Sequence, residues 1–86
     1  MINNLDWDDY YNEFSRVRGV EARTSQAIYR LLPAEYGFNL KILDAYTGEI
    51  VKDIPCLEQQ QALSIAQNIN YKIHLGHSLS DVINSR

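Results

Sequence analysis

Residues 38–55 read FNLKILDAYTGEIVKDIP and hold the clearest structural signal in the chain. Apolar and polar residues alternate over 38–44, which is the two-residue period of a half-buried strand. Thr47 and Gly48 then supply a tight turn, because glycine tolerates the positive φ that such turns demand. The next run, 49–54, is rich in β-branched residues and is followed by a proline. The stretch therefore predicts an antiparallel β-hairpin over residues 38–54.

The same hairpin resembles one found in a known family. Residues 40–55 read LKILDAYTGEIVKDIP, and flagellar FlaG-type proteins share the pattern Asp-x-x-Thr-Gly-Glu, two apolar residues, a base and Ile-Pro. The resemblance covers 16 of the 86 residues, and the aromatic segment before it has no counterpart in that family. It implies the hairpin and carries no function across.

The region before the hairpin, residues 5–32, is predicted to be helical. Its apolar side chains recur at spacings of three, four and seven, which stack on one helical face. They are Tyr10, Phe14, Val17, Thr24, Ile28 and Leu31. One continuous helix would place Glu21 in the apolar stripe and Gly19 in the helix interior, where glycine costs about 1 kcal/mol. Two helices, about 5–18 and 24–32, are therefore favoured over one.

The region after the hairpin returns to a helical pattern from residue 57. Apolar side chains at 62, 65, 66 and 69 share one face, and glutamines cover the other. Residues 71–75 alternate between polar and apolar and leave two alternatives open, a third strand or the end of this helix with Gly76 as its cap. Ser78 and Asp81 match a capping box and predict a short last helix.

Together these elements predict a single α+β domain over residues 1–86. Its parts are an N-terminal helix or helix pair, an antiparallel β-hairpin, a helix with a third strand at 71–75 as the alternative, and a short C-terminal helix. The hydrophobic content of 45% and the charged content of 22% are those of a folded domain. No run approaches the roughly 20 apolar residues of a membrane span. With one cysteine and no secretion signal, the chain is expected in the cytoplasm and away from membranes.

Few residues offer catalytic or metal-binding chemistry. The one candidate metal set is His74, His77, Cys56 and Asp81, but structural zinc sites need four ligands at recognisable paired spacings. Cys56 with either histidine could form a nucleophile and base, yet no local signature surrounds the cysteine. The sequence therefore predicts a protein that is not an enzyme, with no catalytic residue, no cofactor and no metal ligand.

The N-terminal segment mixes aromatic and acidic side chains. Residues 1–14 carry four carboxylates and no basic residue. An amphipathic element of this kind suits a basic, partly apolar surface on another protein, and Trp and Tyr often dominate binding energy. The predicted partner-binding residues are Trp7, Asp8, Asp9, Tyr11 and Glu13. The competing interpretation places Tyr10 and Phe14 in the core and gives the aspartates only a helix-dipole role.

The predicted function is a non-enzymatic protein-interaction module that acts through the aromatic, acidic N-terminal helix. It would be a small acidic regulator or adaptor, or a phage-type inhibitor of a host complex such as a nucleic-acid-handling defence complex. A homodimer is left open. The alternative is a nucleic-acid-binding regulator that uses a stretch of arginines, but the net charge of −3 has the wrong sign for neutralising phosphates. Those arginines are Arg16, Arg18, Arg23 and Arg30.

Overall fold

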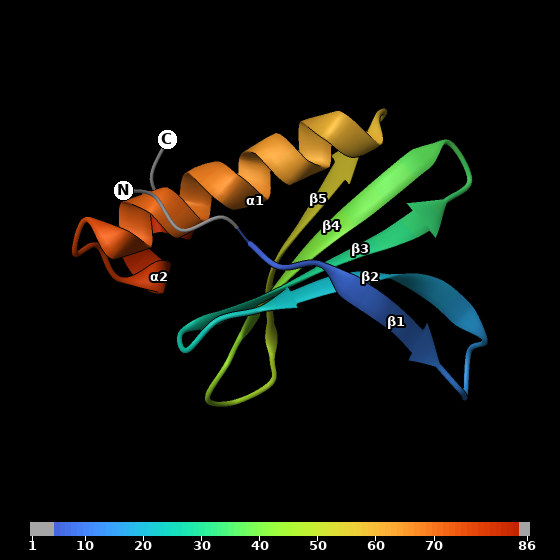
Figure 1. Ribbon diagram of the computed structural model, residues 1–86, viewed down its shortest axis with the longest axis horizontal. Coiled ribbons are helices and arrows are strands. Elements are labelled where there is room, and N and C mark those ends of the chain that lie inside the picture. Colours follow the sequence, from blue (N-terminus) through green and yellow to red (C-terminus); the bar gives the residue numbers. More distant parts are fainter. Residues whose placement is uncertain (1–4, 85–86) are drawn as a thin grey trace.

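The structure is a computed structural model that describes residues 5–84, and it consists of an antiparallel sheet followed by two helices (Figure 1). Each strand pairs with the next one along the chain, so the five strands form an up-and-down sheet in the order β1-β2-β3-β4-β5. The strands are β1 (Asp8–Asn12), β2 (Val17–Arg23), β3 (Ala27–Ala34), β4 (Gly37–Asp44) and β5 (Ile50–Cys56). The helices are α1 (Gln59–His74) and α2 (Leu79–Asn84).

The predicted hairpin is confirmed as β4 and β5, which pair antiparallel. The Asp44 carboxylate organises its turn, because Oδ1 accepts the backbone N–H groups of Tyr46 at 2.8 Å and Thr47 at 3.3 Å. Gly48 takes the expected positive φ, 77°, and its N–H donates to the Asp44 carbonyl at 2.8 Å. Pro55 does not end the strand but lies within β5, an edge strand where proline is tolerated.

The predicted helices over residues 5–32 are wrong, because this region forms β1, β2 and β3. A lone hairpin is marginal in water and gains stability from further strands. Here β3 supplies one by pairing along the whole length of β4. Gly19, interpreted as a helix break, lies inside β2, where a Cβ would collide with the carbonyl oxygen of Leu31. Non-local strand pairing therefore overrides the helical spacing of the apolar residues.

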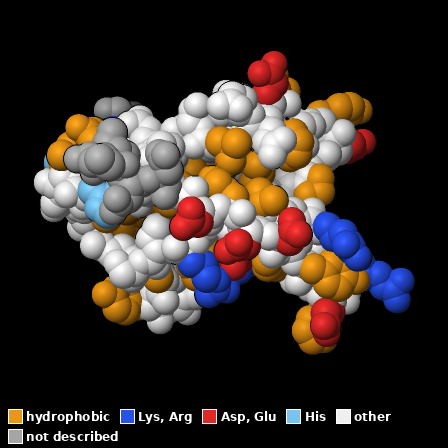
Figure 2. Space-filling model, in the orientation of Figure 1, with side chains coloured by type: hydrophobic (Ala, Val, Ile, Leu, Met, Phe, Trp, Pro, Cys, Tyr) orange, Lys and Arg blue, Asp and Glu red, His pale blue; other side chains and the backbone are white. Residues whose placement is uncertain are grey.

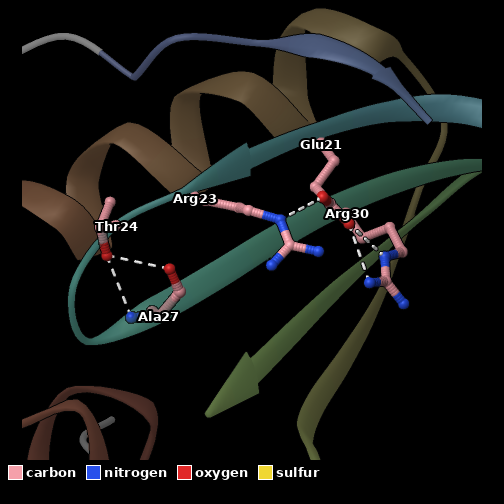
Figure 3. A network of polar contacts seen from close by, with 5 residues as sticks. All are labelled: Glu21, Arg23, Thr24, Ala27 and Arg30. Atoms are coloured by element: carbon pink, nitrogen blue, oxygen red, sulfur yellow. Dashed lines mark hydrogen bonds and ion pairs between the residues drawn. The ribbon is translucent and has the colours of Figure 1, made fainter. Parts of the chain in front are cut away.

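The two turns that join these strands rely on side-chain caps. Asn12 Oδ1 accepts the N–H groups of Phe14 at 2.9 Å and Ser15 at 3.2 Å in the β1–β2 turn. Thr24 Oγ1 accepts the N–H of Ala27 at 3.0 Å and donates to its carbonyl at 2.9 Å in the β2–β3 turn (Figure 3). Asn and Thr make such bonds readily and so favour turns.

Residues 71–74 belong to a helix and not to a third strand, and Leu75 is the C-cap of that helix. α1 continues through His74, and the N–H of Gly76 donates to the Ile73 carbonyl at 3.0 Å. Gly76 has a φ of 105°, which suits a glycine that closes a helix. The short last helix is α2, and its Ser78 Oγ accepts the N–H of Asp81 at 3.1 Å.

The core lies between α1 and one face of the sheet (Figure 1). Ala62 and Ala66 are completely buried and lie four residues apart, so they share the helix face that meets the sheet. The sheet side is formed by larger residues, and α2 adds two more. These are Tyr29, Leu31, Leu40 and Ile42 from the sheet, with Leu79 and Val82 from α2. The small alanines let α1 lie close to the sheet.

Tyr29 gives this core a pH dependence. Its side chain is fully buried, and within the described residues its hydroxyl has no hydrogen-bond partner. Burial raises the pKa of Tyr29 to about 12. The unfolded chain loses this proton near pH 10, so the free energy of unfolding falls as pH rises from about 10 to about 12.

We expect Tyr29 to account for a loss of at most about 3 kcal/mol over this interval. Tyr29→Phe should remove that share of the loss and leave stability at pH 7 unchanged or up to about 1 kcal/mol higher, because an unpartnered buried hydroxyl is removed. Urea unfolding at a series of pH values measures both effects. Tyr46→Phe, at an exposed tyrosine, is the control, and an equal alkaline loss in Tyr29→Phe and wild type would contradict the prediction.

Candidate functional site

The two-residue period of β1 separates the predicted partner-binding residues. Asp9 pairs with Val20, which packs against the core, so Asp9 lies on the face of the sheet that carries α1. Trp7 packs against the same core, and Tyr11 alternates onto the same face. Asp8 lies on the opposite face, and the exposed Glu13 lies in the β1–β2 turn. The structure thus brings together Trp7, Asp9 and Tyr11, and not the whole predicted set.

A groove lies between β1 and α1, and we call it the β1–α1 groove. Trp7 faces one side of α1, which contributes Gln60, Leu63, Gln67 and Tyr71 at helical spacing. Nearer the β1–β2 turn the floor is formed by side chains of the sheet, with Arg18 and Gln59 at the margins. The apolar floor residues are Val20, Leu31, Pro33 and Phe38. Figure 2 shows hydrophobic side chains gathered in this hollow.

The two ends of the groove differ in charge. Acidic side chains lie along its β1 margin in Figure 2, and this part of the chain contributes the exposed Asp6 and Asp9. At the other end the Arg18 guanidinium lies 4.9 Å from the centre of the Tyr11 ring. Tyr11 is 47% exposed, so this stacked pair forms an amphipathic margin open to solvent.

The end of the sheet beside the groove also exposes large apolar side chains. Both the β1–β2 and the β3–β4 turns lie at this end, as does the connection from β5 to α1 (Figure 1). Phe14 in the first turn is 101% exposed, and Tyr36 in the second is 81% exposed. Leu57, just before α1, is 79% exposed. Because these three apolar side chains are mostly exposed, they contribute little to the core of the protein.

The face of the sheet away from α1 carries a row of charges that sequence reasoning missed. Consecutive strand pairings align one charged residue from each strand. In strand order these are Asp8, Glu21, Arg30, Lys41 and Asp53. Lys41 Nζ lies 2.7 Å from Asp53 Oδ2. Only the register, which is a product of the fold, reveals this row, because its members lie 9 to 13 residues apart along the chain.

Glu21 is the second member of the row and contacts two arginines (Figure 3). Its carboxylate pairs with Arg23 at 2.6 Å and with Arg30 at 2.8 Å. Burial opposes the charged form, but the hydrogen bonds and the positive charges of the two arginines outweigh it and hold the pKa of Glu21 below its usual value. Arg30 also lies 4.3 Å from the centre of the Tyr10 ring. Arg23 and Arg30 therefore both contact other side chains of the sheet.

The four arginines of the nucleic-acid alternative do not form one stripe. Arg18 lies at the β1–α1 groove, whereas Arg23 and Arg30 lie on the opposite face. Arg16 occupies the β1–β2 turn with a φ of 59°. The strands place these arginines on both faces of the sheet and in a turn.

Cys56 and the histidines are separated by α1. Cys56 precedes this helix and His74 ends it, so about 24 Å of helix lies between them. Cys56 is 3% exposed, and burial raises the pKa of its thiol, which is the opposite of an activated nucleophile. Among residues 5–84, no group of three His, Cys, Asp or Glu side chains is placed to hold a metal ion.

Comparison with known proteins gives no independent guide to function. No protein-family model, curated protein or solved structure matches this chain. The likeness of residues 40–55 to the FlaG-type hairpin therefore stays local to that hairpin. No helix in the described part of the chain is long and apolar enough to cross a membrane. The function must be argued from the surface itself.

Proposed function

We propose that the chain is a non-enzymatic protein-interaction module, a small acidic regulator or adaptor that binds a segment of another protein in the β1–α1 groove. The observation that carries the proposal is an apolar hollow on the sheet face with Trp7, Tyr11 and Asp9 along its β1 side. Inhibition of a host complex, by occupying a basic surface that handles nucleic acid, is one form that this activity would take.

The chemistry of the groove suits a protein segment. Val20, Pro33 and Phe38 offer apolar area, which drives association when water is displaced from it. Trp7 and Tyr11 belong to the residue types that most often dominate binding energy. Carboxylates at the margin favour basic side chains on the partner and speed its approach. The cytoplasm, where a reduced Cys56 would persist, is the proposed setting.

Charge reversal at two neighbouring positions tests the proposal. Asp9 and Asp8 are adjacent in β1, are both exposed and face opposite sides of the sheet. We expect Asp9→Lys to weaken binding to a partner captured from cells by about tenfold or more, or roughly 1.4 kcal/mol, because a carboxylate at the margin becomes repulsive. Asp8→Lys should change the affinity by less than about twofold.

Affinities for the purified partner are measured by titration calorimetry, with thermal melts to show that both variants fold. A larger effect of Asp8→Lys than of Asp9→Lys would place binding on the opposite face and contradict the proposal. If no protein is captured and the chain instead binds oligonucleotides with an affinity that falls steeply with salt, the nucleic-acid alternative is favoured.

A further inference from the structure

We infer that the occupant of the β1–α1 groove is an amphipathic α-helix with basic residues beside its apolar stripe, lying on the sheet next to α1. The inference rests on the proposed docking function and specifies the shape and charge of the partner segment. It follows from the width of the sheet, the chemistry of the uncovered half and the charge of its margin.

The sheet is too wide for one helix to cover. Five strands about 4.8 Å apart span roughly 19 Å between the edge strands, whereas packed helices lie about 8–10 Å apart. α1 packs mainly against β4 and β5. Figure 1 shows β1 and β2 turning away from α1. The apolar floor of the groove includes Val20 of β2. The uncovered width therefore matches one further helix.

The groove is closed at one end and open at the other. The segment that precedes β1 crosses to α1, where the N–H of Leu5 donates to Gln67 Oε1 at 3.2 Å. From Trp7 the groove runs toward the β1–β2 turn. β2, with seven residues, spans about 23 Å at 3.3 Å per residue. A helix of about 11 residues, or three turns, is about 16 Å long and fits within this length.

The surfaces around the groove fit the sides of an amphipathic helix. Val20 and Phe38 form an apolar floor for its stripe. The opposite wall is the glutamine-rich face of α1, including Gln59 and Gln60, which suits the polar flank of a neighbouring helix. The β1 margin carries Asp9, and β1 itself, which reads DDYYN, holds no basic residue. Basic residues are thus expected on the flank that faces β1.

A β-strand is the less suitable occupant. It would pair along the free edge of β1, and Asp8 and Asp9 place charges on both sides of that edge, a device that discourages added strands. Such pairing would also extend the sheet sideways and leave the hollow above Val20 and Leu31 empty. A helix fills the hollow directly.

Designed peptides test this inference without knowledge of the natural partner. Three peptides of about 14 residues are compared: leucine and lysine in a helical period, the same composition in strict alternation, and leucine with glutamate in the helical period. Trp7 is the only tryptophan in the chain and lines the groove, so its fluorescence reports occupancy. We expect the helical leucine–lysine peptide to shift Trp7 emission and to bind at least about tenfold more tightly than the other two. Asp9→Lys should weaken it by about fivefold or more, and Asp8→Lys by less than about twofold.

Four results would overturn the inference. Equal binding of the alternating peptide would show no preference for a helix, and equal binding of the glutamate peptide would remove the charge argument. Failure of all three peptides to bind would also overturn the inference. Sedimentation of the chain alone supplies the remaining arm, because a dimer that must dissociate before the peptide binds would make a second copy the occupant. In each case, sensitivity of the captured natural partner to Asp9→Lys decides separately whether the proposed docking function survives.

Discussion

Gly37→Ala is expected to destabilise the protein by about 3 kcal/mol or more, because two costs fall on the same residue. Gly37 opens β4 with a φ of 97°, a conformation that residues with a Cβ rarely adopt. A Cβ there would also collide with the carbonyl oxygen of Cys56 and approach the Leu57 Cα to 3.0 Å. Both obstacles are backbone atoms, so a side chain cannot move aside to relieve them. The melting temperature should fall by more than about 12 °C.

Gly48→Ala is the matched control for the backbone conformation alone. Gly48 also has a positive φ, 77°, but nothing lies within 4 Å of a Cβ built on it. Its alanine variant should lose only about 1–2 kcal/mol, the cost of the left-handed conformation. Thermal melts and urea unfolding of both variants measure the difference. If the two variants are equally destabilised, the close approach of β4 to the end of β5 contributes nothing and the expectation for Gly37 is wrong.

The hairpin could be predicted because its signals are local. Alternation over 38–44, Thr47 and Gly48 at the turn, and β-branched residues in 49–54 all lie within one short stretch. The register and the turn contacts of β4 and β5 agree with them. α1 was also predictable, because its apolar face repeats at helical spacing over several turns.

β1 to β3 could not be recognised by the same means. β3 begins apolar on both faces, with the buried Ile28 on one side and the buried Tyr29 on the other, so its first residues show no alternation. β1 is an edge strand with exposed residues on both faces. Apolar residues in three such strands fell by coincidence at helical spacing. Their pairing with β4 is a long-range effect that periodicity does not report.

The candidate site was predictable in composition but not in arrangement. Trp7, Asp9 and Tyr11 were expected to bind a partner, and the structure places them on one side of β1. Asp8 was expected with them, yet a strand places consecutive residues on opposite faces, whereas a helix would place them only about 100° apart. The floor of the groove comes from β2, β3 and β4, which the sequence could not bring beneath an N-terminal helix. The secondary structure of one segment therefore decided the geometry of the whole site.

Ala66→Glu is expected to have the largest effect on the helix–sheet interface, and on the groove as a consequence. Ala66 is completely buried where α1 meets the sheet. A carboxylate there would lose its hydration in a close-packed interface, which costs several kcal/mol. Its greater volume would also separate α1 from β4 and β5. Because α1 forms one wall of the groove, binding of the helical peptide should be lost together with stability.

Ser64→Glu controls for the added charge, because Ser64 is exposed on the same helix two residues earlier. Its free energy of unfolding should stay within about 0.5 kcal/mol of wild type, as for most surface substitutions. Urea unfolding followed by circular dichroism measures both variants. An Ala66→Glu protein as stable as wild type would mean that this face of α1 does not pack on the sheet, and the uncovered half of the sheet would then no longer define a groove.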